Sequence, residues 1–299
     1  MKPDHRENTV GPWAKQKLDA LEAYLLAYMN VMKNTPFNLV FVDAFAGSGV
    51  AKIRRAEFKD NLMDAFLEIE DVEAADQFIK GSPLRALGLH RPFDHYFFID
   101  RDPVRVELLS KLKNEHTNTD IRAKAGDANL EVQKIAKSFT QWNLRGVAFL
   151  DPYGAHLHWA TLESLAKTEK FDVIINFPLE MAINRLLKLD ADLSSNTRDQ
   201  LNLCFGCEDW FDAAFEKTSG LFGDGIAKRS NAKERLLKLY LERLKALFGH
   251  VAGPSEVRNT KGIPLYHLIW ASSNSRGQPI AKHILDLGDK VHVPAKRKS

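Results

Sequence analysis

Hydrophobic residues follow two alternating patterns along the first 180 positions. Short runs rich in apolar residues occupy 38–43, 96–100, 121–125, 146–151 and 172–177. Between them apolar residues recur every three or four positions, as in the stripe of Leu18, Leu21, Leu25, Tyr28 and Met32. The runs predict buried strands, and the longer spacing predicts amphipathic helices. Strands that alternate with helices in this way predict an α/β fold, a Rossmann-like doubly wound, mostly parallel sheet.

Two segments depart from this alternation. Residues 51–80 carry an acidic, helical pattern, and residues 181–250 look almost wholly helical. A late strand is predicted at 266–271 and a last helix at 277–287. We therefore predict one domain over 1–299, and its parts are a helical cap at 1–36, an α/β core at 37–180, a helical insertion at 181–250, and a closing segment at 251–299 with the final strand or strands, a helix and a basic tail.

Two helix starts are marked by their residue types. Ser82 before Pro83 predicts a capped helix, and Asp102 before Pro103 predicts another. Elsewhere, Cys204 and Cys207 stand in CFGC without a second pair or suitably spaced histidines, so ordinary packing and no metal site are expected.

Charge and hydropathy add a few limits. The net charge is +3, from 42 Lys and Arg against 39 Asp and Glu. A basic stretch at 228–245 is compatible with a solvated helix face or with a footprint for DNA or RNA, and both remain open. No apolar run reaches the roughly 20 residues of a membrane span, and the N-terminus lacks an apolar signal core. A cytoplasmic location and no membrane partner are the expectations.

The first three strands end in acidic residues and turns, at 43–49, 100–103 and 126–128. Ligands of an open parallel sheet bind beyond the carboxyl ends of its strands. Gly47 and Gly49 let the backbone approach a ligand, and Asp100 is suited to ribose hydroxyls because Asp102 is placed to cap the next helix. Asp127 is suited to accept from an adenine amino group. Together they predict an adenosyl cofactor, with contacts from Asp43, Ala44, Phe45, Gly47, Gly49, Asp100, Asp127 and Ala128.

A nicotinamide cofactor is disfavoured by the same loop. A dinucleotide-binding fingerprint needs a third glycine three residues after the second, and an acidic residue about 20 residues further on. Val50-Ala51-Lys52 does not supply that glycine, and Asp100 lies much further along the chain.

The fourth strand ends in Asp151, Pro152, Tyr153 and Gly154. This loop resembles the Asp-Pro-Pro-Tyr loop of amino-group methyltransferases, in which the first side chain and a proline carbonyl accept hydrogen bonds from the target amine and the aromatic ring stacks on the base. A conjugated amine is a poor nucleophile until its protons are held, and a base must leave its duplex to react. Here there is one proline, and the tyrosine falls one position early. These four residues are the predicted catalytic loop.

Motifs along nearly the whole chain resemble the three-Cys-motif partner protein family, TcmP. They are a helix from Lys17-Leu18 to Tyr28, VDAFAGSG at 42–49, GSP at 81–83, FFIDRDP at 97–103, GDAN at 126–129, FLDPYG at 149–154, NFPLEMAINRLL at 176–187, FGCEDW at 205–210 and LYHLIWASSN at 265–274. The resemblance implies a methyltransferase-type sheet, S-adenosyl-L-methionine as the cofactor, and a radical-SAM-like partner that carries the three cysteines. A more distant likeness is to an adenine-N6 methyltransferase of ribosomal RNA.

Several functions remain open from the sequence. The first is a transferase that methylates an amino group, expected on a nucleobase, which the Asp151 loop and the basic stretch favour. The second is a non-catalytic module that binds the cofactor or the three-Cys-motif partner, which the altered loop favours. The third is a methyltransferase that acts on a protein or small molecule.

Overall fold

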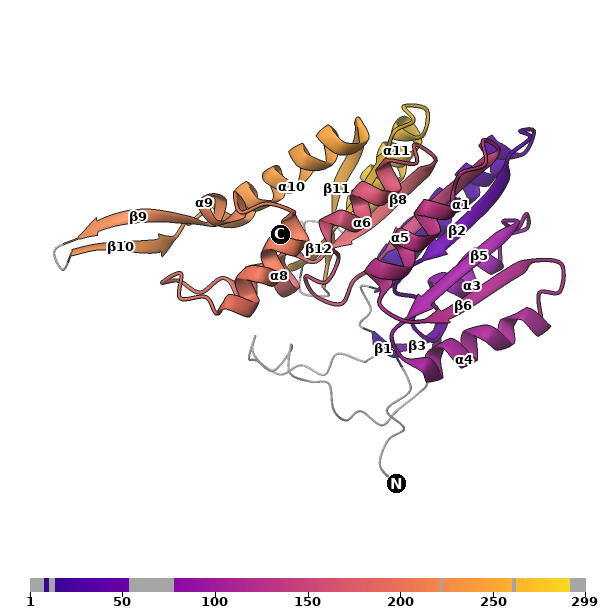
Figure 1. The fold of residues 1–299 in the computed structure, drawn as a ribbon, viewed down its shortest axis with the longest axis horizontal. Helices are drawn as coiled ribbons and strands as arrows, with labels where there is room; N and C mark the ends of the chain where they lie inside the picture. The colour runs from indigo at the N-terminus through magenta and orange to yellow at the C-terminus, as the bar shows by residue number, and fades with distance from the viewer. Residues whose placement is uncertain (1–7, 11–13, 54–77, 221–222, 260–261, 291–299) are drawn as a thin grey trace, which may run out of the picture.

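A seven-stranded sheet forms the centre of the protein in the computed structural model, which describes residues 8–10, 14–53, 78–220, 223–259 and 262–290 (Figure 1). Its strand order is β11-β12-β8-β7-β2-β5-β6. The strands are β2 (Asn38–Asp43), β5 (His95–Asp100), β6 (Asp120–Ala125), β7 (Leu144–Leu150), β8 (Phe171–Phe177), β11 (His250–Arg258) and β12 (Pro264–Ser272).

Five neighbouring strands of this sheet run parallel, and two close one edge antiparallel. β2 pairs in parallel with β5 and with β7, β6 extends one side, and β8 extends the other. β12 then runs antiparallel to β8, and β11 antiparallel to β12. The chain winds outward from β2 in one direction and then returns to its other side, so the carboxyl ends of β2 and β7 flank a topological switch point, where such sheets bind ligands. The predicted doubly wound, mostly parallel sheet is confirmed.

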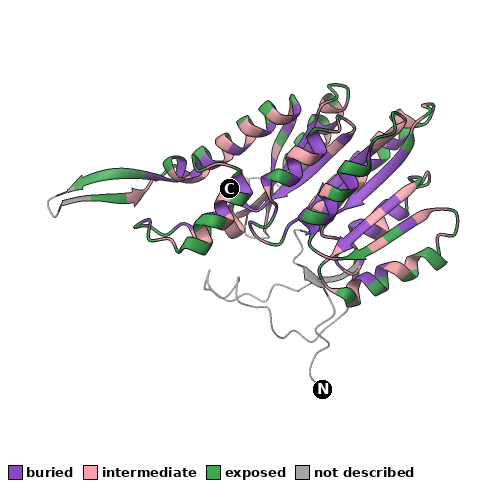
Figure 2. Cartoon of the chain, viewed as in Figure 1, coloured by how far each residue is buried: buried purple, intermediate pink, exposed green. Residues whose placement is uncertain are grey.

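Helices cover both faces of the sheet, and the side chains of each strand alternate between them. Phe41, Phe98 and Phe149 pack into one apolar cluster with helices α1 (Ala14–Met32), α3 (Ser82–Leu87), α4 (Pro103–Lys111) and α11 (Gly277–Lys290). Their chain neighbours Val42, Ile99 and Leu150 pack into a second cluster with helices α5 (Ala128–Ser138), α6 (Trp159–Ala166), α8 (Ser195–Phe205) and α10 (Ala232–Phe248). β2, β7 and β8 are largely buried (Figure 2), as their apolar runs predicted, whereas in the edge strand β6 only Ile121 is buried.

The prediction of an almost wholly helical 181–250 was wrong in part. Besides α8, α10 and the short helix α9 (Trp210–Ala214), this segment contains a hairpin of β9 (Phe215–Gly220) and β10 (Gly223–Lys228), which extends away from the sheet (Figure 1). Two basic side chains hold the base of this hairpin by hydrogen bonds. Arg229 donates to the carbonyls of Asp212 and Phe215, and Lys228 donates to the Asn184 side chain at 2.7 Å. Thr-Ser-Gly and Gly-Asp-Gly in this stretch are turn and strand-end signals that outweigh its helical spacing.

The predicted acidic helix over 51–80 was wrong at both ends. Residues 50–53 form β3 (Val50–Ile53), which pairs with β4 (Phe78–Lys80) and with β1 (Asn8–Val10). Residues 54–77 lie outside the described part of the chain. The glycine loop therefore leads into a small three-stranded sheet, and that sheet returns the chain directly to α3.

Three local predictions had different outcomes. Asp102 caps α4 by accepting a hydrogen bond from the Val104 amide, as expected. The cap of α3 is Gly81 rather than Ser82, although Pro83 stands in the first turn as predicted. Ser82 is instead buried beside Asp43. The sequence allowed a second late strand but did not locate β11, because Gly253-Pro254 interrupts its apolar pattern and leaves a register shift against β12.

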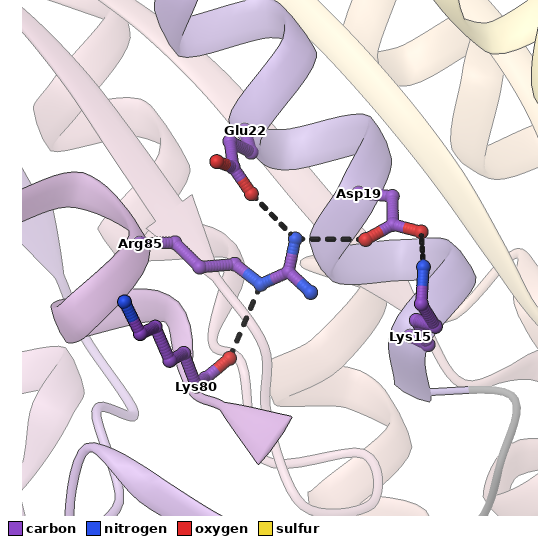
Figure 3. Close-up of polar contacts among 5 residues, drawn as sticks. All are labelled: Lys15, Asp19, Glu22, Lys80 and Arg85. Atoms are coloured by element: carbon purple, nitrogen blue, oxygen red, sulfur yellow. Dashed lines mark hydrogen bonds and ion pairs between the residues drawn. The ribbon is translucent and has the colours of Figure 1, made fainter. Parts of the chain in front are cut away.

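An arginine joins α1 to α3 (Figure 3). Arg85 Nη1 donates to Asp19 Oδ1 at 2.8 Å and to Glu22 Oε2 at 2.6 Å, and its Nε donates to the Lys80 carbonyl at 3.1 Å. The Arg85 side chain is 10% exposed, whereas both carboxylates are nearly half exposed. Because its planar fork reaches three acceptors at once, Arg85 fixes α1 against the end of β4.

Replacing Arg85 with alanine is expected to lower the free energy of unfolding by about 1–2 kcal/mol, since charged hydrogen bonds in a partly buried position are lost. Arg85→Lys should recover less than half, because an ammonium cannot reproduce the fork. Urea denaturation measures both. The control is Lys15→Ala, which removes an exposed ion pair with the same Asp19 and should cost less than about 0.5 kcal/mol. Equal losses for the Arg85 and Lys15 variants would contradict this role.

Candidate functional site

Acidic residues at the ends of β2, β5 and β7 meet on the α1 face of the sheet. Strand alternation places Asp43, Asp100 and Asp151 on the side of Phe41, Phe98 and Phe149. The parallel registers bring their strand ends to one edge. The predicted grouping of these side chains is therefore present in the fold.

Asp43 is fully buried at the centre of this edge. The Ser82 hydroxyl and the Phe45 amide lie beside its carboxylate, and both act to lower its pKa. Burial raises the pKa of Asp43 to about 7; the neighbouring Ser82 hydroxyl only partly opposes this, and the negative charge of Asp151 adds to it. Ionising a fully buried carboxyl costs free energy, which a cation placed near it would recover.

The glycine loop after Asp43 is held between its two neighbouring strands. Gly47 and Gly49 have φ angles of 64° and 82°, a region that other residues enter with strain. Ala44 N donates to the Phe149 carbonyl at 3.1 Å. Phe45 is half-buried and packs against the core. The loop therefore presents its backbone at the switch point without side chains at its two glycines.

Asp100 organises this loop as well as ending β5. Its Oδ2 accepts from Gly47 N at 2.9 Å, and its Oδ1 accepts from Asp102 N at 2.8 Å. Arg105 Nη1 lies 3.8 Å from the same carboxylate. A carboxylate has about four lone-pair positions, so two hydrogen bonds leave capacity for a ligand hydroxyl. Asp100 is thus both a loop anchor and a candidate ligand contact.

Asp127 stands at the third strand end and caps α5. Its Oδ1 accepts from the Leu130 amide at 3.1 Å, and the side chain is exposed. The next residue, Ala128, is buried at the helix start. The structure joins this turn to β5, because Gly126 N donates to the Asp100 carbonyl at 3.0 Å. The second and third predicted cofactor segments are therefore adjacent.

Asp151 accepts two charged or polar hydrogen bonds from elsewhere in the chain. Lys17 Nζ, from α1, lies 2.5 Å from its Oδ2, and Asn176 Nδ2, from the end of β8, lies 2.7 Å from its Oδ1. The Lys17 side chain is 13% exposed and that of Asp151 is 24% exposed, so both reach the surface of the site. Lys17 also lies over the Tyr266 ring, 5.8 Å from its centroid. A cation and a carboxylate therefore lie side by side just after the end of β7.

The rest of this loop turns sharply outward. Pro152 is buried and Gly154 has a φ of 74°, whereas Tyr153 is 83% exposed. An aromatic ring this exposed contributes little to the core. The loop is then anchored by the buried side chains of Ala155 and Leu157.

Asn129 ties the loop after Asp151 to the first turn of α5. Its Nδ2 donates to the His156 carbonyl, and its Oδ1 accepts from His158 N, each at 2.9 Å.

In the described part of the chain, the histidines and cysteines near the site do not form a metal site. Burial lowers the pKa of the His158 ring, while His156 Nδ1 lies 3.5 Å from Gln200. Among the residues that the structure describes, no group of three or more His, Cys, Asp or Glu could hold a metal ion. Cys204 is buried, which raises the pKa of its thiol to about 12.

A second polar pair lies on the other face of the sheet. His267 Nε2 and Glu180 are 3.3 Å apart, and His267 is 3% exposed. His267 is the register partner of Phe177, so it faces away from Asn176, which pairs with Leu268. This pair is therefore separate from the Lys17–Asp151–Asn176 cluster.

The basic stretch at 228–245 is largely committed to internal contacts. Arg235 and Arg243 donate to the carbonyls of Ala213 and Gly206, and the Arg243 guanidinium lies over the Trp159 ring. Lys228 and Arg229 hold the hairpin as described above. These four cations stabilise the fold, so the stretch gives little support for a nucleic-acid surface.

Three residues of the site were not singled out by the sequence, namely Lys17, Asn129 and Asn176. All three stand inside the motifs that carry the TcmP resemblance, but nothing in their local pattern assigns Lys17 and Asn176 to Asp151, or Asn129 to the loop after it. Lys17 is 134 residues from Asp151 in the chain. The one local signal was polarity at the end of an apolar strand, at Asn176.

Comparisons with known proteins give matches among solved structures, but none among family models or curated proteins. Among solved structures, protein LPL1258 from Legionella pneumophila is 15% identical, with 91% of this chain and 99% of that chain covered and a TM-score of 0.42. The N-terminal domain of EvdMO1, solved with SAH and D-fucose, is 11% identical, with 85% and 82% covered and a TM-score of 0.37. These scores are low, so the function rests on the geometry of the site itself. Within the described ranges, no helix has the length and apolarity to cross a membrane.

Proposed function

We propose that the protein is an S-adenosylmethionine-dependent methyltransferase that acts on the amino group of a nucleobase. The observation that carries the proposal is the pairing of Lys17 with Asp151 beside the fully buried carboxyl of Asp43. The TcmP resemblance adds a three-Cys-motif protein as the proposed partner.

The residues of the strand ends fit the cofactor. The buried Asp43 carboxyl lies behind the glycine loop, where its negative charge favours the α-ammonium group, and Gly47 keeps the loop backbone free of a side chain. Asp100 has lone pairs left for the ribose hydroxyls, and Asp127 is exposed where an adenine amino group can donate to it. When bound, S-adenosylmethionine supplies an electrophilic methyl group.

The Lys17–Asp151 pair supports an amine that has a hydrogen-bond acceptor next to it. Asp151 accepts a hydrogen bond from the amino group, and Lys17 donates one to the neighbouring ring nitrogen. Adenine and cytosine both present this donor–acceptor edge. The exposed Tyr153 ring provides a stacking surface for an unpaired base, worth about 1–3 kcal/mol per base in such sites. A base fits this combination better than a lysine side chain, which offers no acceptor.

The same residues assist transfer by position and charge. Asp151 is held in one orientation by two donors, so its carboxylate is fixed before the amine arrives. It holds an amino proton, which keeps the nitrogen lone pair free, and it stabilises the positive charge that develops on nitrogen. Lys17 holds the Asp151 side chain in place while it orients the base.

Calorimetric titration of S-adenosylmethionine into the full chain tests the cofactor site. We expect saturable binding that Asp127→Ala weakens by about tenfold or more, as for loss of one charged hydrogen bond. Asp127→Ser is the matched control, because serine keeps a cap for the Leu130 amide but its shorter side chain cannot also reach adenine. Its affinity should fall as much as that of the alanine variant, without loss of thermal stability. Absence of binding to folded wild-type protein would refute the proposal.

A non-catalytic module is the second candidate. Both Asp151 oxygens already accept hydrogen bonds within the chain, and Tyr153 stands one position earlier than in the amino-methylation loop. Incubation with labelled cofactor and short unpaired oligonucleotides, with and without the three-Cys-motif partner, separates the two. Label on adenine or cytosine supports the enzyme, whereas cofactor binding without label under either condition supports the module.

A further inference from the structure

Asn129 is buried between the predicted adenine-binding turn and the catalytic loop. It is 4% exposed and lies in the first turn of α5, two residues after Asp127. Its one amide group makes three hydrogen bonds of 2.9 Å, to the His156 carbonyl, the His158 amide and the Thr161 hydroxyl. Among the described residues, the bonds to His156 and His158 join the start of α5 to this loop.

These bonds use both ends of the amide in a way that few side chains can. Nδ2 is the donor to a backbone carbonyl, and Oδ1 is the acceptor for a backbone amide and a hydroxyl. Aspartate has no donor for the His156 carbonyl, and leucine has neither group. The arrangement therefore specifies asparagine, and it satisfies two backbone groups of a loop that has no strand partner for them.

The position of Asn129 connects two events in the proposed reaction. Asp127 caps the first turn of α5 by accepting from the Leu130 amide. A ligand that binds Asp127 therefore contacts this turn. The same turn carries Asn129, and Asn129 holds residues 156 and 158, immediately after the loop that contains Asp151 and Tyr153. Ordering of this turn therefore restrains the catalytic loop through one buried side chain.

We propose that Asn129 is a positioning residue that couples occupancy of the cofactor site to the order of the 151–158 loop. The proposal rests on the proposed function, because it requires an adenosyl ligand at Asp127. It assigns Asn129 no contact with substrate or cofactor. By linkage, the loop should in turn strengthen retention of the cofactor.

Amide hydrogen exchange with and without S-adenosylhomocysteine tests this coupling in the full chain. In the wild type, saturating ligand should slow exchange of the amides at 156–158 by about 5-fold or more, a typical coupling factor. In Asn129→Leu the slowing should fall below about 2-fold, while S-adenosylhomocysteine still binds. Asn129→Asp should give an intermediate value, because it keeps the acceptor for the His158 amide but sets a carboxylate oxygen against the His156 carbonyl.

Thr161→Val is the matched control for stability. It removes a buried hydrogen bond to the same Asn129 oxygen but leaves both loop bonds in place. It should lower the melting temperature and yet keep the full ligand-dependent slowing. Undiminished slowing in a folded Asn129→Leu protein, or equal loss in Thr161→Val, would overturn the coupling. Failure of the wild type to bind S-adenosylhomocysteine by calorimetry would instead refute the proposed function, and this inference with it.

Discussion

Asp151→Asn is expected to slow methyl transfer by about 10²–10³-fold, the usual loss when one preorganised electrostatic contact to the reacting group is removed. The substitution keeps the shape of the side chain but removes the charge that faces the amine. It also leaves the Lys17 ammonium without its carboxylate partner. Label transfer from methyl-labelled cofactor to an oligonucleotide with one unpaired adenine measures the rate.

The cofactor should remain bound in this variant. Asp151 is not one of the proposed cofactor contacts, so the affinity for S-adenosylhomocysteine should stay within about threefold of the wild type. A rate above one tenth of the wild-type value would show that Asp151 does not face the amine. Loss of cofactor binding together with the rate would show instead that the site has collapsed.

Lys17→Met tests whether Lys17 donates a hydrogen bond to the ring nitrogen of the base. If Lys17 donates to the ring nitrogen next to the amine, replacement of adenine by 1-deazaadenine should slow the wild type by about tenfold, because a partly buried donor is left unpaired. The same replacement should have little effect on Lys17→Met, which has lost the donor already. An equal penalty in both proteins would remove Lys17 from the edge contact while leaving the role of Asp151 intact.

The affinity for S-adenosylmethionine is expected to rise with pH up to about 7 and then to level off. Burial raises the pKa of Asp43 to about 7, so the free protein holds this carboxyl protonated under acidic conditions. The α-ammonium of the cofactor favours the ionised form, and binding below pH 7 must therefore release a proton. Affinity should change by up to about tenfold per pH unit in that range.

Stability of the free protein should change in the opposite sense. Because the folded-state pKa is raised, Asp43 contributes most to stability at low pH, and this contribution is lost as the pH rises through about 7. The loss is at most about 1.4 kcal/mol per pH unit over the range between the two pKa values. Asp43→Asn should flatten both curves, and urea denaturation and calorimetry from pH 5 to pH 8 measure them. Identical cofactor affinities at pH 5.5 and pH 8 in the wild type would exclude a cationic group at Asp43.

The sequence alone determined the sheet and the strand-end side of the site. Its apolar runs located β2, β5, β7 and β8 to within two residues, because strands covered on both faces need uninterrupted apolar side chains. The edge strand β6 was located as closely, although only Ile121 in it is buried. The acidic residues that follow those runs could be assigned to one edge, since parallel strands in a doubly wound sheet end on the same side. Asp43, Asp100 and Asp151 were found in this way.

Only the tertiary structure decided what these residues contact. Lys17 reaches Asp151 from a helix 134 positions away, and Asn129 uses donors and acceptors of a loop on another strand. The basic residues after 228 looked solvent-facing by charge, yet several of them bind carbonyls of the fold. Local patterns report which side chains must leave water, because burial follows the period of the helix or strand. The choice of hydrogen-bond partner depends on which distant elements pack together, and no local period carries that information.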